Sequence, residues 1–144
     1  MRIRNDLRSA VLMTRAGLLM ALLLVPSCAK SAWTADEVVG EFRAYGLPTR
    51  DAREPSPGDC PVGGARPRNV RRFGGDTVSA AGWACILQFD DASTALKART
   101  ELRGNNGTGS ASQRDNIVLL LSADFDGASA AAYRNALQRM WGGE

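Results

Sequence analysis

The chain has 144 residues, of which 18 are basic and 15 acidic, and its formal net charge is +3. That excess lies entirely in residues 1–27, because the remaining residues hold 14 basic and 14 acidic side chains. The balanced part lacks the basic footprint that binding to a phosphate backbone requires, so we expect no nucleic-acid partner. Its length suits a single small domain.

The first 27 residues have the organisation of a secretory signal peptide. Arg2, Arg4, Arg8 and Arg15 precede an uncharged run of ten residues, 16–25, which leads into the small residue Ser27. Basic, apolar and small-residue segments in this order are typical of a signal that is cleaved. A bilayer-spanning helix needs about 20 residues, so removal of this run is expected rather than its retention as an anchor.

The residues around Cys28 resemble the lipobox of bacterial lipoproteins. Val25, Ser27 and Cys28 match the pattern, whereas Pro26 departs from the residues usual at its position. The resemblance implies that signal peptidase II cuts before Cys28 and that its thiol carries a diacylglyceryl group. The membrane is then a partner through the lipid on Cys28, and the protein is held at the outer face of the cytoplasmic membrane. The alternatives are cleavage after Ala29 or Ser31, which would give a secreted protein, and an uncleaved anchor.

The three cysteines are Cys28, Cys60 and Cys85. An odd count in an exported protein leaves one cysteine to explain. If Cys28 carries the lipid, Cys60 and Cys85 remain as a pair in an oxidising compartment, where a disulfide can persist. We therefore predict a Cys60–Cys85 disulfide.

Residues 28–33 are expected to be a lipidated tether, followed by a single extracytoplasmic domain over 34–144. Thr34 and Glu37 form a capping box that begins a helix over about 35–46. Five prolines and three glycines within 47–68 predict a long loop without regular structure, pinned by the disulfide.

Beyond that loop, two strands are predicted over 70–73 and 82–89, and a helix over about 92–103. Residues 104–115 are small and polar and are expected to be mobile, with a weak strand over 109–113 as the alternative. The unbroken apolar run at 117–121 predicts a central strand covered on both faces, and a last helix is expected over 128–141. This order predicts an α+β fold, a mainly antiparallel sheet of three to four strands packed with three helices. The arrangement loosely resembles small actinobacterial lipoproteins of unknown function.

The chain has few of the side chains that enzymes commonly use for catalysis. The chain contains no histidine, which excludes Ser–His–Asp and Cys–His catalysis and removes the commonest zinc ligand. No catalytic residue, metal site or cofactor is therefore predicted. Arg66, Arg68, Arg71 and Arg72 form a local basic cluster, which we interpret as a solvated loop and strand edge. Trp33 either serves the rim of the core or lies at the lipid headgroups.

Carboxylates are the remaining catalytic candidates. Asp90 and Asp91 follow one predicted strand, and Asp124 and Asp126 follow another, so the four would cluster only if the strand ends meet. We interpret them as helix caps and turn residues. The expected function is a non-enzymatic envelope domain that binds an envelope protein or a small ligand. The alternatives are a carboxylate-dependent hydrolase and a structural or stress-related surface protein.

Overall fold

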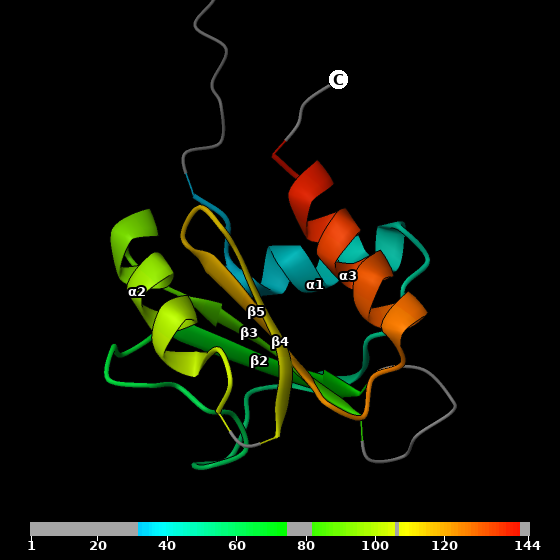
Figure 1. Ribbon diagram of the computed structural model, residues 1–144. Coiled ribbons are helices and arrows are strands. Elements are labelled where there is room, and N and C mark those ends of the chain that lie inside the picture. Colours follow the sequence, from blue (N-terminus) through cyan, green and yellow to red (C-terminus); the bar gives the residue numbers. More distant parts are fainter. Residues whose placement is uncertain (1–31, 75–81, 106, 142–144) are drawn as a thin grey trace, which may run out of the picture.

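The computed structural model describes residues 32–74, 82–105 and 107–141. Cys28 and the signal segment lie outside these residues. The described chain forms three helices and five strands, in the order α1 (Ala35–Ala44), β1 (Arg50–Arg53), β2 (Asn69–Gly74), β3 (Trp83–Gln88), α2 (Ala92–Leu102), β4 (Thr108–Arg114), β5 (Ile117–Ser122) and α3 (Gly127–Arg139) (Figure 1).

All five strands belong to one antiparallel sheet with the order β1-β2-β3-β5-β4. The predicted α+β class with three helices and an antiparallel sheet is confirmed, but the sheet has five strands rather than three to four. The sequence prediction missed β1, which lies inside the proline-rich segment 47–68. Residues 108–114, for which mobility was expected and a weak strand was the alternative, form β4. Both are edge strands whose pairing comes from a neighbour and not from their own composition.

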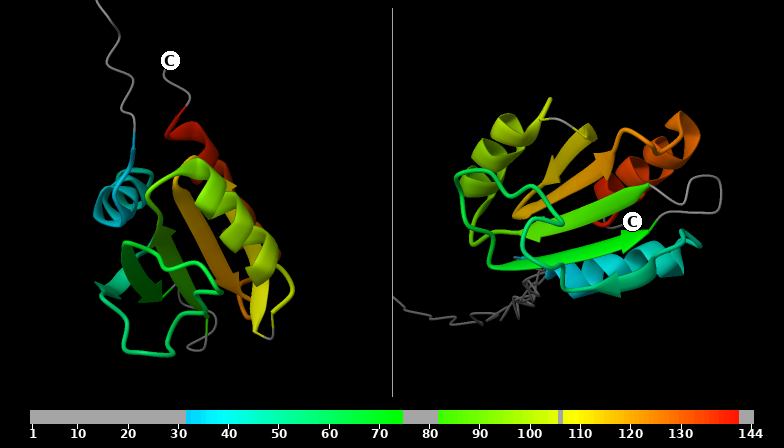
Figure 2. Two further views of the ribbon diagram at one scale, coloured as in Figure 1. Left: turned by 90° about the vertical axis from the view of Figure 1, so that its left-hand side faces the viewer. Right: turned by 90° about the horizontal axis from the view of Figure 1, so that it is seen from below.

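Helices cover both faces of the sheet (Figure 2). On one face, α1 and α3 pack against the alternate strand residues Ile86, Leu119 and Leu121. On the other, α2 and the loop around Cys60 pack against Leu87 and Leu120. Every residue of β5 is buried, so the predicted central strand covered on both sides is confirmed. Burial on both faces explains why its apolar run does not alternate.

The first helix begins as the sequence predicts. The hydroxyl of Thr34 accepts a hydrogen bond from the main-chain N–H of Glu37, whose carboxylate accepts one from the N–H of Thr34. Phe42 of α1 then packs edge-on against Tyr133 of α3, with their ring centroids 5.2 Å apart. The Tyr133 hydroxyl donates to the carbonyl of Pro48, which ties the start of the proline-rich segment to this core.

Both edge strands are irregular, whereas the pairings between β2, β3 and β5 keep continuous register. The β1 pairing shifts between Arg50 and Arg53, where Asp51 adopts a positive φ of 52°. The β4 pairing shifts between Thr108 and Ser110. A Cβ on the intervening Gly109 would lie 2.7 Å from the Cα of Ala123, so the close approach of the two backbones requires glycine there.

Candidate functional site

Cys60 and Cys85 form a disulfide, as predicted. Cys85 lies in β3 and is fully buried, while Cys60 lies in the loop that covers the α2 face of the sheet. The bond joins residues 25 apart in the sequence. It therefore holds a loop that contains few apolar side chains of its own against the centre of the sheet.

The N-terminal end of the described chain is fixed to the domain by Asn116, in the turn between β4 and β5. The Trp33 N–H donates to Asn116 Oδ1 (3.2 Å), and Asn116 Nδ2 donates to the Trp33 carbonyl (3.0 Å). The same Nδ2 also donates to the carbonyl of Phe89 (3.2 Å). Asn116 is only 3% exposed, so it connects three separate chain segments from inside the protein.

Trp33 also contacts Trp141, which follows α3, with a ring-centroid distance of 5.1 Å. The start of the described chain and the end of α3 therefore lie side by side at one end of the molecule (Figure 1). Both rings are partly buried and pack against the α1–α3 core. The interpretation of Trp33 as part of the rim of the core is thus supported.

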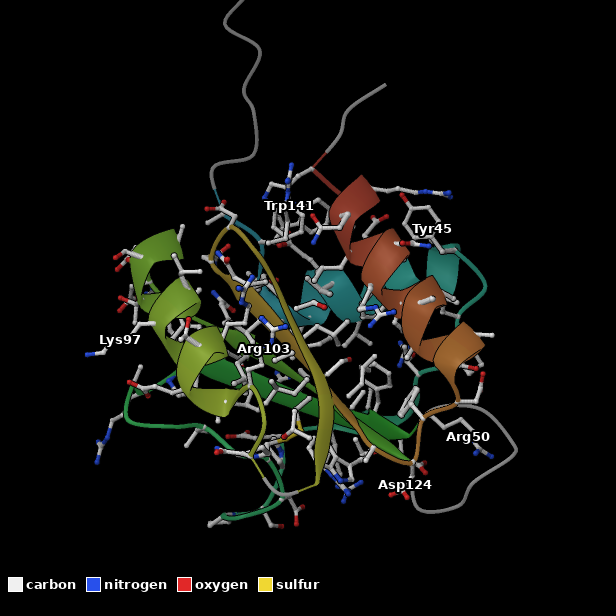
Figure 3. The ribbon with its side chains drawn as sticks, in the orientation of Figure 1. Tyr45, Arg50, Lys97, Arg103, Asp124 and Trp141 are labelled. Atoms are coloured by element: carbon white, nitrogen blue, oxygen red, sulfur yellow. A yellow bond between two sulfur atoms is a disulfide. The ribbon has the colours of Figure 1, made fainter. Side chains whose placement is uncertain are left out.

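The four candidate aspartates do not form one cluster. Their strands, β3 and β5, are neighbours, but they run antiparallel, with Gln88 opposite Ile117 and Ala84 opposite Leu121. Asp90 and Asp91 therefore follow one end of the sheet, and Asp124 and Asp126 follow the other, about 17 Å along the strands. The side chain of Asp124 is exposed at that end (Figure 3).

Two of these aspartates are helix N-caps, as the sequence suggested. Asp91 accepts from the main-chain N–H of Thr94 at the start of α2, and this bond lowers the pKa of its carboxyl. Asp126 accepts from the hydroxyl and N–H of Ser129 at the start of α3, and these bonds lower its pKa too. Each carboxylate thus stabilises the amino end of a helix.

A lowered folded-state pKa predicts how the stability that each cap contributes depends on pH. Because folding favours the ionised carboxylates, their contribution to stability is present above pH 4 and disappears as the pH falls through their folded-state pKa values. We expect Asp126→Asn, which keeps a capping oxygen but cannot ionise, to flatten the fall in melting temperature between pH 5 and about pH 2. Thermal unfolding followed by circular dichroism checks this. A pH profile identical to that of the unmodified protein would contradict it.

The basic cluster predicted from residues 66–72 is dispersed. Arg71 makes two hydrogen bonds to the carboxylate of Asp36 in α1 (2.6 and 2.8 Å), and Arg68 pairs with Asp90 at 3.3 Å. In β2, Arg71 lies opposite Ile86 and Arg72 lies opposite Cys85, so the two adjacent arginines point to opposite faces of the sheet. These residues consequently do not form a shared anion site.

A different set of arginines does meet, beside β4. Arg99 and Arg103 come from the last turn and C-cap of α2, and Arg134 comes from α3. With Gly104 and residues 109–112 they line a pocket of about 340 Å³ that contains no carboxylate among its lining residues. Figure 3 shows Arg103 beside the strand. We call this the β4 pocket.

Two polar atoms in the β4 pocket are shielded from solvent without a hydrogen-bond partner in the described structure, Nε of Arg99 and Oγ of Ser110. Leaving such a buried group unsatisfied costs about 1–3 kcal/mol, and more when it is charged. Because both atoms are shielded, a ligand in the open pocket does not reach them. What the β4 pocket offers a ligand is three cationic side chains with no carboxylate beside them.

Sequence reasoning missed the β4 pocket because its three arginines are spread over 36 positions and belong to two helices that the sequence does not place together. It concentrated instead on arginines adjacent in sequence. The side chain of Lys97 points into solvent from α2 (Figure 3).

Within the described residues there is no group of three or more His, Cys, Asp or Glu side chains that could hold a metal ion. The helices in that part of the chain are also too short or too polar to cross a bilayer. Comparison with protein-family models, curated proteins and solved structures gives no match to this chain. Its function must therefore be argued from its own residues.

Proposed function

We propose that this protein is a membrane-anchored envelope lipoprotein whose domain binds a ligand or partner without catalysing a reaction. The proposal depends above all on the residues that lead into Cys28: a basic segment, a short apolar run and a lipobox-like cysteine. The Cys60–Cys85 disulfide supports it, because such bonds persist in oxidising compartments. It also accounts for the other two cysteines and leaves Cys28 for the lipid.

The way the chain enters the domain gives the tether a defined geometry. Only four residues lie between Cys28 and Trp33, so an extended chain from Cys28 to Trp33 spans at most about 18 Å. Trp33 is held by Asn116 and packs on Trp141. A lipid on Cys28 would therefore keep the Trp33–Trp141 end of the domain close to the membrane, where tryptophan is favoured at the headgroup boundary.

The opposite end of the sheet would then face away from the membrane. In β4, Arg114 adjoins the turn that holds Trp33, whereas Gly109 lies about 17 Å farther along the strand. The β4 pocket occupies this more distant part. The function that this arrangement supports best is ligand binding, by a domain that is tethered at one end and has its pocket farther from that end.

The anchor is tested by Cys28→Ala in the full chain. We expect the protein to move from the membrane fraction and the detergent phase to the aqueous phase, because two acyl chains hold a protein firmly and none remain. Phase partition and intact mass are the measurements. Cys60→Ala is the matched control and should stay with the membrane. An unmodified mature chain without added acyl mass would refute the proposal.

A further inference from the structure

The β4 pocket gathers positive charge from both sides of the sheet edge. Arg99 and Arg103 belong to α2, which covers one face, and Arg134 belongs to α3, which covers the other. Within the described residues, none of these three guanidinium groups forms an ion pair with a carboxylate. By contrast, Arg71 in β2, near the opposite edge of the sheet, has a carboxylate partner in Asp36.

Helix electrostatics explains only part of this arrangement. Cations near the carbonyl end of α2 are favourable, which accounts for Arg99 and Arg103. It does not account for Arg134, which lies in the middle of α3. The property that the three guanidinium groups share is that none of them has a carboxylate partner among the described residues.

The charge and the number of donors favour phosphate over carboxylate. One arginine can satisfy a carboxylate by a two-bond fork, as Arg71 does with Asp36. A phosphate monoester carries a charge of about −1.5 to −2 and three strong acceptor oxygens, which suits three guanidinium groups. The pocket volume of about 340 Å³ lies within the range for small-ligand sites, so it leaves room for an organic group beside the phosphate.

We infer that the β4 pocket binds the phosphate group of a small soluble phosphate monoester, held by Arg99, Arg103 and Arg134. This inference rests on the proposed function and deepens it, since it gives the chemical class of ligand for the binding domain. The ligand is soluble and not a lipid headgroup because the pocket lies beyond the tethered Trp33 end of β4.

The test is a calorimetric titration of the mature protein with glucose 6-phosphate at an ionic strength of about 0.15 M, with glucose and inorganic phosphate as comparison ligands. The protein is taken from whichever fraction contains it, membrane in neutral detergent or medium, so failure of the anchor does not affect the binding result. We expect saturable binding of both phosphates and none of glucose. Arg99→Gln and Arg134→Gln should each weaken binding about tenfold or more, because each loses charge-assisted hydrogen bonds.

Arg66→Gln is the matched control, because it removes the same charge from an exposed residue outside the pocket. It should change the dissociation constant by no more than about twofold, since exposed distant charges are screened. Arg103→Gln and Arg134→Gln change exposed side chains, so they test the site without disturbing the buried core, and their melting temperatures confirm folding. The inference is overturned if glucose 6-phosphate does not bind or if Arg66→Gln weakens binding as much as Arg134→Gln. Retention on phosphatidic acid vesicles without affinity for the soluble phosphates would equally reject it.

Discussion

Loss of the Cys60–Cys85 disulfide should lower the free energy of unfolding by about 3–4 kcal/mol. The bond closes a loop between residues 25 apart, and without it the unfolded chain gains the conformational entropy of that loop. The folded domain also depends on it, because Cys60 anchors the proline-rich loop to the α2 face of the core. A domain of this size buries a modest fraction of its surface, so this loss is large relative to its stability.

Urea unfolding followed by tryptophan fluorescence measures the effect, with the unmodified protein compared in the presence and absence of dithiothreitol. This comparison changes no side-chain volume. The Cys60→Ala/Cys85→Ala double variant should unfold near the midpoint of the reduced protein and should not respond to the reductant. A reduced protein that unfolds at the same urea concentration as the oxidised one would show that the bond contributes nothing.

Asn116→Ala is the second change with a large expected effect, a loss of about 2–3 kcal/mol in the free energy of unfolding. Alanine cannot accept from the Trp33 N–H or donate to the Trp33 and Phe89 carbonyls, so three hydrogen bonds disappear. Asn116 is buried, and water does not readily replace its amide. The Trp33 segment should also detach from the domain.

Chemical unfolding gives the stability change, and a red shift of the native fluorescence spectrum reports exposure of Trp33. Asn135→Ala in α3 is the matched control, because Asn135 is exposed and alanine favours a helix. It should leave both properties nearly unchanged. If Asn116→Ala is as stable as Asn135→Ala, the Asn116 amide does not hold the Trp33 segment in place.

The elements that the sequence predicted well carry local signals. The capping box of Thr34 and Glu37 predicts the start of α1, and the apolar run of β5 predicts its burial on both faces of the sheet. The disulfide followed from the number of cysteines. By contrast, β1 is a four-residue strand of mostly charged residues, whose only reason to be extended is its pairing with β2. Such pairing is a tertiary effect that overrides local propensity.

The site was harder to predict for a related reason. The sequence left open whether the four aspartates meet and favoured helix caps and turn residues. The direction of β3 relative to β5 decides the question, and that direction is antiparallel. The β4 pocket likewise depends on where α2 and α3 lie relative to one strand edge. Neither fact can be inferred from residue types alone, because both depend on topology.

The irregular edge strands bear on how copies of this domain would behave under the proposed anchor. Such an anchor would raise the local concentration of identical domains, and a flat exposed strand would then recruit a neighbour's strand and start polymerisation. The shift at Asp51 and the one beside Gly109 interrupt the ladder of main-chain hydrogen bonds at each open edge. Both interruptions disfavour the pairing of one domain's sheet edge with that of its neighbour.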